Sequence, residues 1–236
     1  MSAIDSSITV NYWSGRGLAE PSRMMMSMSG LDFKDNRCSA PAENLECNLG
    51  RMPTVAVANQ GAIGQSLAQY FYVASTCGLL GSSPFEAAKC LEIAEHLKEL
   101  KTEWYKVVPY GTEPSQEQFD KWFIGGGNDT TGPAGSRGER YLTWYMGRIE
   151  AALTGTNGFA VGWKISLADV LMYNTFAEHL EESESSMPED KRYPFNSKAR
   201  MEEALAKYPK IAASCKKITE HAGAAQYLKT RGPQGF

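Results

Sequence analysis

The 236-residue chain lacks several features that would reveal its class at once. No apolar run reaches the roughly 18 residues that a membrane-spanning helix needs, so we expect no membrane span. The first ten residues contain neither a basic stretch nor an apolar core, which argues against a secretory signal and favours a cytoplasmic protein. The formal net charge is only −3, so composition indicates no affinity for nucleic acid or an anionic membrane.

The sequence is also poor in metal ligands at useful spacing. It contains no CxxC pair, and its three histidines lie far apart. The five cysteines are widely spread and odd in number: Cys38, Cys47, Cys77, Cys90 and Cys215. We therefore expect free thiols in a reducing compartment, with no disulfide and no metal site.

What is present divides into two parts of different character. The first 80 residues alternate short strand patterns with helical ones. The expected elements are a strand at 7–13, a helix within 15–30, a strand at 31–37, a hairpin at 54–64 and a helix from Ser66. A strand–helix–strand unit implies a parallel pair and a hairpin adds antiparallel strands, so the predicted fold is α/β with a mixed sheet.

Beyond residue 80 the patterns are helical only. Ser83, Pro84 and Glu86 predict a capped helix start, and apolar residues follow at helical spacing: Ala88, Leu91, Ala94, Leu97 and Trp104. A second capping box is predicted at Ser166 and Asp169. We therefore expect two domains, an α/β one over 1–80 and an all-helical one over 84–236.

Two conspicuous segments carry no functional signal. The glycine-rich stretch 125–138 lacks the Lys and Ser or Thr that a phosphate-binding loop needs after its last glycine. The stretch 181–195 begins with acidic residues and is typical of a solvated loop between helices. Both are interpreted as loops.

The N-terminal end of the helix at Gln65–Ser66, called the helix mouth below, is the first candidate binding site. The first amides of a helix are unpaired and the helix dipole is positive there, so this end suits a carboxylate. The Ser66 hydroxyl and the Gln65 amide would add side-chain donors. The alternative is that Ser66 only caps its own helix.

Pro53 suggests a second contact point. A proline that opens a strand cannot donate a ladder hydrogen bond, and here it predicts a cis peptide bond after Met52. Met52 would then offer its backbone N–H and C=O to an extended peptide, as an added strand would use them. Together with the helix mouth, this describes a cleft for a short peptide with a carboxylate.

Tyr12 is the candidate chemical group. It ends the first strand before a glycine-containing turn, where its hydroxyl could reach the helix mouth. A phenol that donates a hydrogen bond to a thiolate lowers the pKa of the thiol. The alternative is a tyrosine that packs its ring and leaves its hydroxyl in water.

Four motifs in register resemble those of the cytosolic glutathione transferases, most closely the tyrosine-type mu and sigma classes. They are YWSGRGLAEPSR (12–23), GRMP (50–53), QSLAQY (65–70) and SLADV (166–170). The resemblance implies a thioredoxin-like N-terminal domain, an all-helical C-terminal domain and a homodimer. It also implies glutathione as co-substrate and no metal.

The resemblance further implies a role for each matching residue. Tyr12 would activate the thiol, and Trp13 would contact the peptide. Arg51, Met52 and Pro53 would meet the cysteinyl part of glutathione, and Gln65 with Ser66 would bind its γ-glutamyl carboxylate. The acceptor pocket would lie between the domains, with Trp104 and Tyr110 as candidate lining residues; helix-core packing is the alternative for Trp104.

The chain also departs from these relatives. The segment before Gly50 is shorter and lacks the Trp and Lys that commonly hold the glycyl carboxylate, with Asn44 near the position of the Lys. An acidic pair of the first long helix is replaced around Lys98 and Glu99, which argues against a sigma-type metal site.

Three functions were weighed. The leading hypothesis is an enzyme of detoxification type that adds glutathione, as thiolate, to hydrophobic electrophiles. The alternative is a non-catalytic binding or structural protein, as lens crystallins are. A thiol–disulfide exchanger ranks last, because the turn at Ser14–Arg16 has no cysteine.

Overall fold

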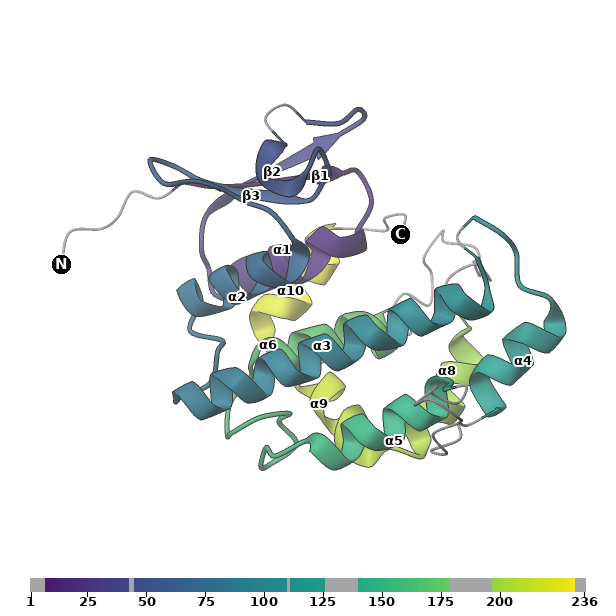
Figure 1. Ribbon diagram of the computed structural model, residues 1–236. Helices are drawn as coiled ribbons and strands as arrows, with labels where there is room; N and C mark the ends of the chain where they lie inside the picture. The colour runs from purple at the N-terminus through teal and green to yellow at the C-terminus, as the bar shows by residue number, and fades with distance from the viewer. Residues whose placement is uncertain (1–6, 43–44, 110, 126–139, 179–196, 232–236) are drawn as a thin grey trace, which may run out of the picture.

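The structure is a computed structural model that describes residues 7–42, 45–109, 111–125, 140–178 and 197–231 (Figure 1). The glycine-rich stretch from 126, the segment 179–196, Asn44 and Tyr110 lie outside the described residues. Two layers dominate the view, a sheet with its helices at the top and a set of longer helices beneath.

A four-stranded mixed sheet forms the N-terminal part, as the sequence predicts. Its strands are β1 (Ile8–Trp13), β2 (Phe33–Cys38), β3 (Thr54–Val57) and β4 (Gly61–Ile63). Their order is β2-β1-β3-β4, with β1 parallel to β2 and both hairpin pairings antiparallel. The register pairs Tyr12 with Arg37 and Asn11 with Thr54, so the polar end of β1 lies beside the start of β3.

Two helices cover the face of the sheet that looks toward the longer helices (Figure 1). They are α1 (Glu20–Met28), preceded by the short turn η1 (Gly17–Ala19), and α2 (Ser66–Thr76). The methionine run of α1 is core, since Met24, Met25 and Met26 are fully buried. This packing uses the adaptability of methionine.

The C-terminal part is helical throughout the described residues. Its elements are α3 (Pro84–Val107), α4 (Gln116–Ile124), α5 (Leu142–Ala152), α6 (Leu167–Met172), the π-helical turn η4 (Tyr173–Ala177), α8 (Lys198–Ala206), α9 (Pro209–Thr219) and α10 (Ala222–Arg231). The helix α3 runs across the molecule below α1 and α2 (Figure 1). This agrees with a thioredoxin-like domain followed by a helical one.

The predicted helix starts are present, with one difference. Ser166 and Asp169 form a complete capping box at α6. At α3 the Ser83 side chain accepts a hydrogen bond from the Glu86 N–H, but Glu86 in turn accepts from the N–H of Ser82 rather than Ser83. The second half of this box is therefore displaced by one residue.

The buried face of α3 differs from the predicted one at its start. Ala88 is exposed and Leu91 only partly buried, whereas Cys90, Ile93 and Leu100 are buried. The apolar period was right in spacing, but the packing of α6 and α5 against α3 determines which stripe is covered.

A buried group of charged residues joins the two parts of the chain. The fully buried Glu20 of α1 accepts hydrogen bonds from Tyr227 (2.9 Å) and Arg231 (2.6 Å) of α10. Arg231 also pairs with Glu178 after η4, which lies 3.4 Å from Arg16. Burial, and then the like charge of Glu178, raise the pKa of the Glu20 carboxyl. These contacts hold α10 against α1, as Figure 1 shows.

No helix among the described residues combines the length and apolarity needed to cross a membrane. All five cysteines are free thiols, as expected.

Candidate active site

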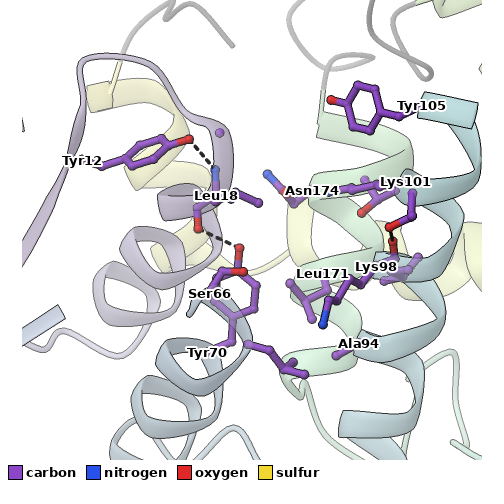
Figure 2. Close-up of a pocket in the computed structure, with 15 residues that line it drawn as sticks. Tyr12, Leu18, Ser66, Tyr70, Ala94, Lys98, Lys101, Tyr105, Leu171 and Asn174 are labelled. Carbon is purple, nitrogen blue, oxygen red and sulfur yellow. Dashed lines mark hydrogen bonds between the residues drawn. The ribbon is translucent and has the colours of Figure 1, made fainter. Parts of the chain in front are cut away.

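A cavity of about 390 Å³ lies between the sheet part and the long helix α3. Figure 2 shows its two walls facing each other, with Tyr12, Leu18, Ser66 and Tyr70 on one side and α3 residues on the other. The α3 wall consists of Ala94, Leu97, Lys98, Lys101, Thr102 and Tyr105, joined by Leu171, Asn174 and Thr175. Most of the lining is apolar, with polar groups concentrated at a few points, as is typical of a small-molecule site.

Tyr12 directs its hydroxyl toward this cavity from the end of β1 (Figure 2). The phenol oxygen accepts a long hydrogen bond (3.4 Å) from the Leu18 N–H. Because the oxygen is the acceptor, the phenol proton stays available for a ligand. Gly17 makes room for the ring, since a Cβ at that residue would lie 2.5 Å from the Tyr12 hydroxyl. Tyr12 can therefore donate a hydrogen bond to a thiolate placed in the cavity.

The N-terminus of α2 faces the same cavity as Tyr12. Ser66 lines the cavity as the first helical residue, and the N–H groups of Ser66 and Leu67 make no hydrogen bond within the part of the chain that the structure describes. Such amides, at the positive end of the helix, suit an anion. Burial raises the pKa of the neighbouring Tyr70 phenol, and a hydrogen bond with Ser66 opposes this shift.

Gln65, not Ser66, occupies the N-cap position, so the simple capping alternative for Ser66 does not hold. The Gln65 backbone has φ 58° and ψ 119°, a conformation that non-glycine residues rarely adopt, and its side chain caps nothing. Its N–H donates to the Asn48 side chain (2.9 Å), which holds the residue in place. The exposed Gln65 side chain is left at the rim of the helix mouth.

The Met52–Pro53 peptide bond is cis, as the sequence predicts. Neither the N–H nor the C=O of Met52 has a hydrogen-bond partner among the described residues. A backbone donor and acceptor left open beside a strand are what an extended peptide can pair with. Both backbone groups of Met52 are therefore open to a ligand, and the peptide contact there stays a prediction.

Two buried amide side chains hold this loop, and neither was identified from the sequence. The Asn48 amide donates to the carbonyls of Arg51 (3.0 Å) and Pro53 (2.9 Å). Gln69 donates to the same Pro53 carbonyl (2.8 Å) and to that of Ile63 (3.1 Å). Both residues fix the Met52 segment relative to the mouth of α2. A glutamine on the buried face of a helix was the one available signal, since burial of an amide requires partners.

Of the remaining predicted residues, two are exposed, one is buried in the core and one lies outside the described residues. Trp13 and Arg51 are exposed and do not line the cavity. Trp104 is fully buried, with its ring edge-on to Trp122 (centroids 5.2 Å apart) and not part of the cavity wall. The expectation that Trp104 lines the pocket is therefore not met, and its alternative, helix-core packing, is. Tyr110 falls outside the described residues.

The α3 wall carries two lysines that the sequence analysis did not assign to the site. Lys98 and Lys101 both line the cavity. Burial lowers the pKa of the Lys101 ammonium to about 8, opposed by the negative charge of Glu178. Periodicity alone could not reveal which flank of α3 faces the sheet part. Within the described ranges, no group of three or more His, Cys, Asp or Glu side chains could hold a metal ion.

Comparisons with known proteins agree with this geometry. Residues 136–231 match the family model described as the glutathione S-transferase C-terminal domain. S-crystallin 2 of Octopus vulgaris is 23% identical over 98% of this chain and 99% of its own. The class-mu 28 kDa glutathione S-transferase isozyme of Schistosoma japonicum is 24% identical over 85% of this chain and 93% of its own.

A solved structure shows the same fold. Na-GST-3, a glutathione S-transferase of the hookworm Necator americanus described as monomeric, superposes with a TM-score of 0.71 at 19% identity, over 98% of this chain and all of that one. The family-model match covers the C-terminal part of the chain, and these relatives extend the likeness along most of its length.

Proposed function

We propose that this protein is a glutathione transferase of the tyrosine type, with mu- or sigma-like character, in which Tyr12 activates the thiol. The observation that carries the proposal is the meeting of two features at one cavity: the phenol proton of Tyr12 and the open amides of α2. Glutathione matches both, because it has a thiol and, at its γ-glutamyl end, a carboxylate.

The binding mode follows from the groups left open around the cavity. The γ-glutamyl carboxylate would be held at the Ser66 and Leu67 amides, by the Ser66 hydroxyl and by the Gln65 side chain. The cysteinyl backbone would pair with the N–H and C=O of Met52, in the manner of an added strand. Arg51 and Trp13 stand at the exposed rim, where the rest of the peptide would pass.

The chemistry requires only the removal of one proton. The thiol of bound glutathione releases its proton to solvent, and Tyr12 donates a hydrogen bond to the resulting thiolate, which lowers the thiol pKa. The thiolate sulfur then forms a bond to an electrophilic carbon of a hydrophobic acceptor in the cavity. In a substitution the leaving group departs with the electron pair of its bond; in an addition the electron pair of the double bond moves to the neighbouring atom, which takes a proton from solvent. A hydrogen bond to a charged group contributes about 1.5–3 kcal/mol, which corresponds to about one to two units of thiol pKa.

The test is a pH titration of the protein–glutathione complex followed by thiolate absorbance in the ultraviolet. We expect the bound thiol to ionise well below its free pKa, and Tyr12→Phe to raise that pKa by about one to two units. Tyr72→Phe, on α2 but outside the cavity lining, is the matched control and should leave the pKa unchanged. Bound glutathione with an unshifted thiol would overturn the proposed role of Tyr12.

The S-crystallin matches favour a second candidate, a protein of this fold that binds ligands or serves a structural role without catalysis. Glutathione retained on an affinity column, together with no turnover of any hydrophobic electrophile tested, would select it. Retention with turnover selects the transferase.

We also propose a cytoplasmic homodimer that acts in detoxification. Large apolar side chains lie exposed at several places, among them Leu49 (79%) and Phe85 (71%), and a second copy of the chain could cover them. Light scattering that gives twice the 25.9 kDa chain mass would support the dimer, and the chain mass itself would contradict it.

A further inference from the structure

The cavity has an uneven distribution of charge between its walls. Two lysines, Lys98 and Lys101, line it from α3, whereas no Asp or Glu is among the lining residues in the part of the chain that the structure describes. They are three residues apart on one helix, so their side chains emerge from the same face. Figure 2 shows both on the side opposite Tyr12.

Lys101 has no hydrogen bond or ion pair with any described residue of the chain. The acidic group that acts on it, Glu178, is already engaged by Arg16, Arg231 and the Asn174 amide. Lys98 is more exposed, and its ammonium lies 3.6 Å from Glu95 in a solvated pair of the kind that contributes little. A partly buried cation that no acidic group among the described residues contacts directly is costly unless a ligand supplies further negative charge.

Between these lysines and Tyr12 the lining is mostly apolar, with Asn174 and Thr175 as polar neighbours. Leucine side chains from four elements contribute to it: Leu18, Leu67, Leu97 and Leu171. A ligand that satisfies every part of this surface has a hydrophobic body and one anionic end. The hydrophobic body would lie against the leucines and the anionic end at the lysines.

We propose that the cavity selects hydrophobic acceptors that carry a single carboxylate, which Lys101 binds with help from Lys98, and that the electrophilic carbon is thereby directed toward Tyr12. This inference names the acceptor class and so rests on the proposed transferase function. Lys101 is then the residue that determines specificity for the charged end of the acceptor.

The reaction with such an acceptor balances without any further reagent. For an α,β-unsaturated ketone, the glutathione sulfur forms a bond to the β-carbon while the electron pair of the carbon–carbon double bond moves to the α-carbon. The α-carbon then takes a proton from solvent, which replaces the proton that the thiol released. The carboxylate at Lys101 is unchanged throughout.

Binding is tested first, with no catalysis involved. Isothermal titration compares octanoate with octanamide, which has the same chain but no charge, in the presence of glutathione. We expect the protein to bind octanoate about tenfold more tightly than octanamide. Lys101→Met should abolish this preference, and Lys101→Arg should retain it. Lys106→Met is the matched control: it lies on the same helix, largely exposed, outside the cavity, and should keep the preference.

Two results would overturn the inference: equal affinities for the two ligands in the unmodified protein, or a preference that survives in both Lys101→Met and Lys98→Met. Thermal unfolding of each variant ensures that a lost preference reflects the site. If Lys101→Met does not fold, Lys98→Met and Lys101→Arg still test the inference. Lys98→Met should reduce the preference for octanoate over octanamide, and Lys101→Arg should keep it.

The pH dependence gives an independent measurement. Burial places the pKa of Lys101 near 8, so the ammonium is charged below that pH and neutral above it. The groups that face it are Lys98 and Tyr105 on α3, Tyr12 on β1, Tyr70 on α2 and Glu178 after η4. Octanoate affinity should fall as the pH rises through about 8, octanamide affinity should not change, and Lys101→Arg should remove the dependence. Identical profiles for the two ligands would contradict the inference.

A kinetic comparison separates this inference from the proposed function. Glutathione conjugation is measured with an α,β-unsaturated ketone that bears a terminal carboxylate and with its methyl ester. Turnover of both at equal kcat/KM would leave the transferase function intact and overturn the acceptor preference. No turnover of either, with octanoate preferred in binding, would overturn the transferase function and leave the anion site.

Discussion

Two groups of polar atoms in this molecule differ in how completely the fold satisfies them. Within the helical part, the buried carboxylate of Asp169 accepts hydrogen bonds from the N–H groups of Ala160 (2.7 Å) and Ser166 (2.9 Å). It accepts two more from the hydroxyls of Ser166 (2.8 Å) and Ser214 (2.6 Å). By contrast, the Met52 backbone has no such partners among the described residues, nor do the first α2 amides and the Lys101 ammonium at the cavity.

The difference separates structural polar groups from those available to a ligand. Burial raises the pKa of the Asp169 carboxyl, but four donors oppose that shift and hold two helices and a loop together. Polar groups without a partner contribute no such hydrogen-bond energy to the fold. A ligand that pairs with them gains that energy as binding affinity. Substitutions in the first group should therefore change stability, and substitutions in the second should change binding.

The largest effect is expected at Asp169. Asp169→Ala leaves four donors without their acceptor in the core, so we expect the free energy of unfolding to fall by about 3–5 kcal/mol. Urea unfolding measures this loss. The control is Asp120→Ala, which removes a surface pair with Arg200 and should leave the free energy of unfolding nearly unchanged. Similar losses in the two variants would remove the distinction.

A smaller effect, on binding alone, is expected at Ser66. Ser66→Ala removes a hydroxyl at the mouth of α2, so the dissociation constant for glutathione should rise about tenfold while the urea midpoint stays in place. Calorimetry with glutathione measures it, and Ser75→Ala, exposed on the same helix, is the control. A loss of stability without a loss of affinity would assign Ser66 to the fold.

The smallest effect is expected at Gln65, where the backbone itself is strained. Gln65→Gly relieves the positive φ, so we expect the free energy of unfolding to rise by up to about 1 kcal/mol while glutathione affinity falls with the loss of the amide. Asn59→Gly is the control, since Asn59 also has positive φ but lies in the β3–β4 turn.

The two variants should therefore differ in their affinity for glutathione and not in the direction of their stability change. Asn59→Gly should stabilise slightly, because asparagine tolerates this conformation better, and should leave glutathione affinity unchanged. If Gln65→Gly bound glutathione as tightly as the unmodified protein does, the strained residue would have no role in the site.

Local signals predicted much of this molecule. The order of strands and helices along the chain, the cis bond before Pro53 and the capping box at Ser166 each depend on residues close together in sequence, so the sequence displays them directly. The assignment of Ser66 to the helix mouth was right for the same reason. That Gln65 is the N-cap and Ser66 the first helical residue was not predictable. Gln65 adopts a positive φ, and its N–H is fixed by a hydrogen bond to Asn48, 17 residues away.

Features set by distant packing were missed. Which face of α3 is buried depends on helices that follow it by tens of residues. The sequence therefore placed Ala88 on the buried face, left Trp104 open between pocket and core, and assigned no position to Lys101. The loop-holding amides of Asn48 and Gln69 act across similar separations. No period or motif encodes such contacts, which form only when the parts meet.

The pairing of Glu20 with Arg231 has a consequence for how the protein is made. The two residues are 211 positions apart, so at about 5–20 residues per second a ribosome needs about 10–40 s between them. During that time Glu20 has Arg23 of its own helix nearby (3.7 Å) but lacks the hydrogen bond from Arg231, so its burial is incompletely compensated. Synthesis is therefore expected to leave α1 incompletely packed, and the sheet part should reach its final packing only after α10 has emerged.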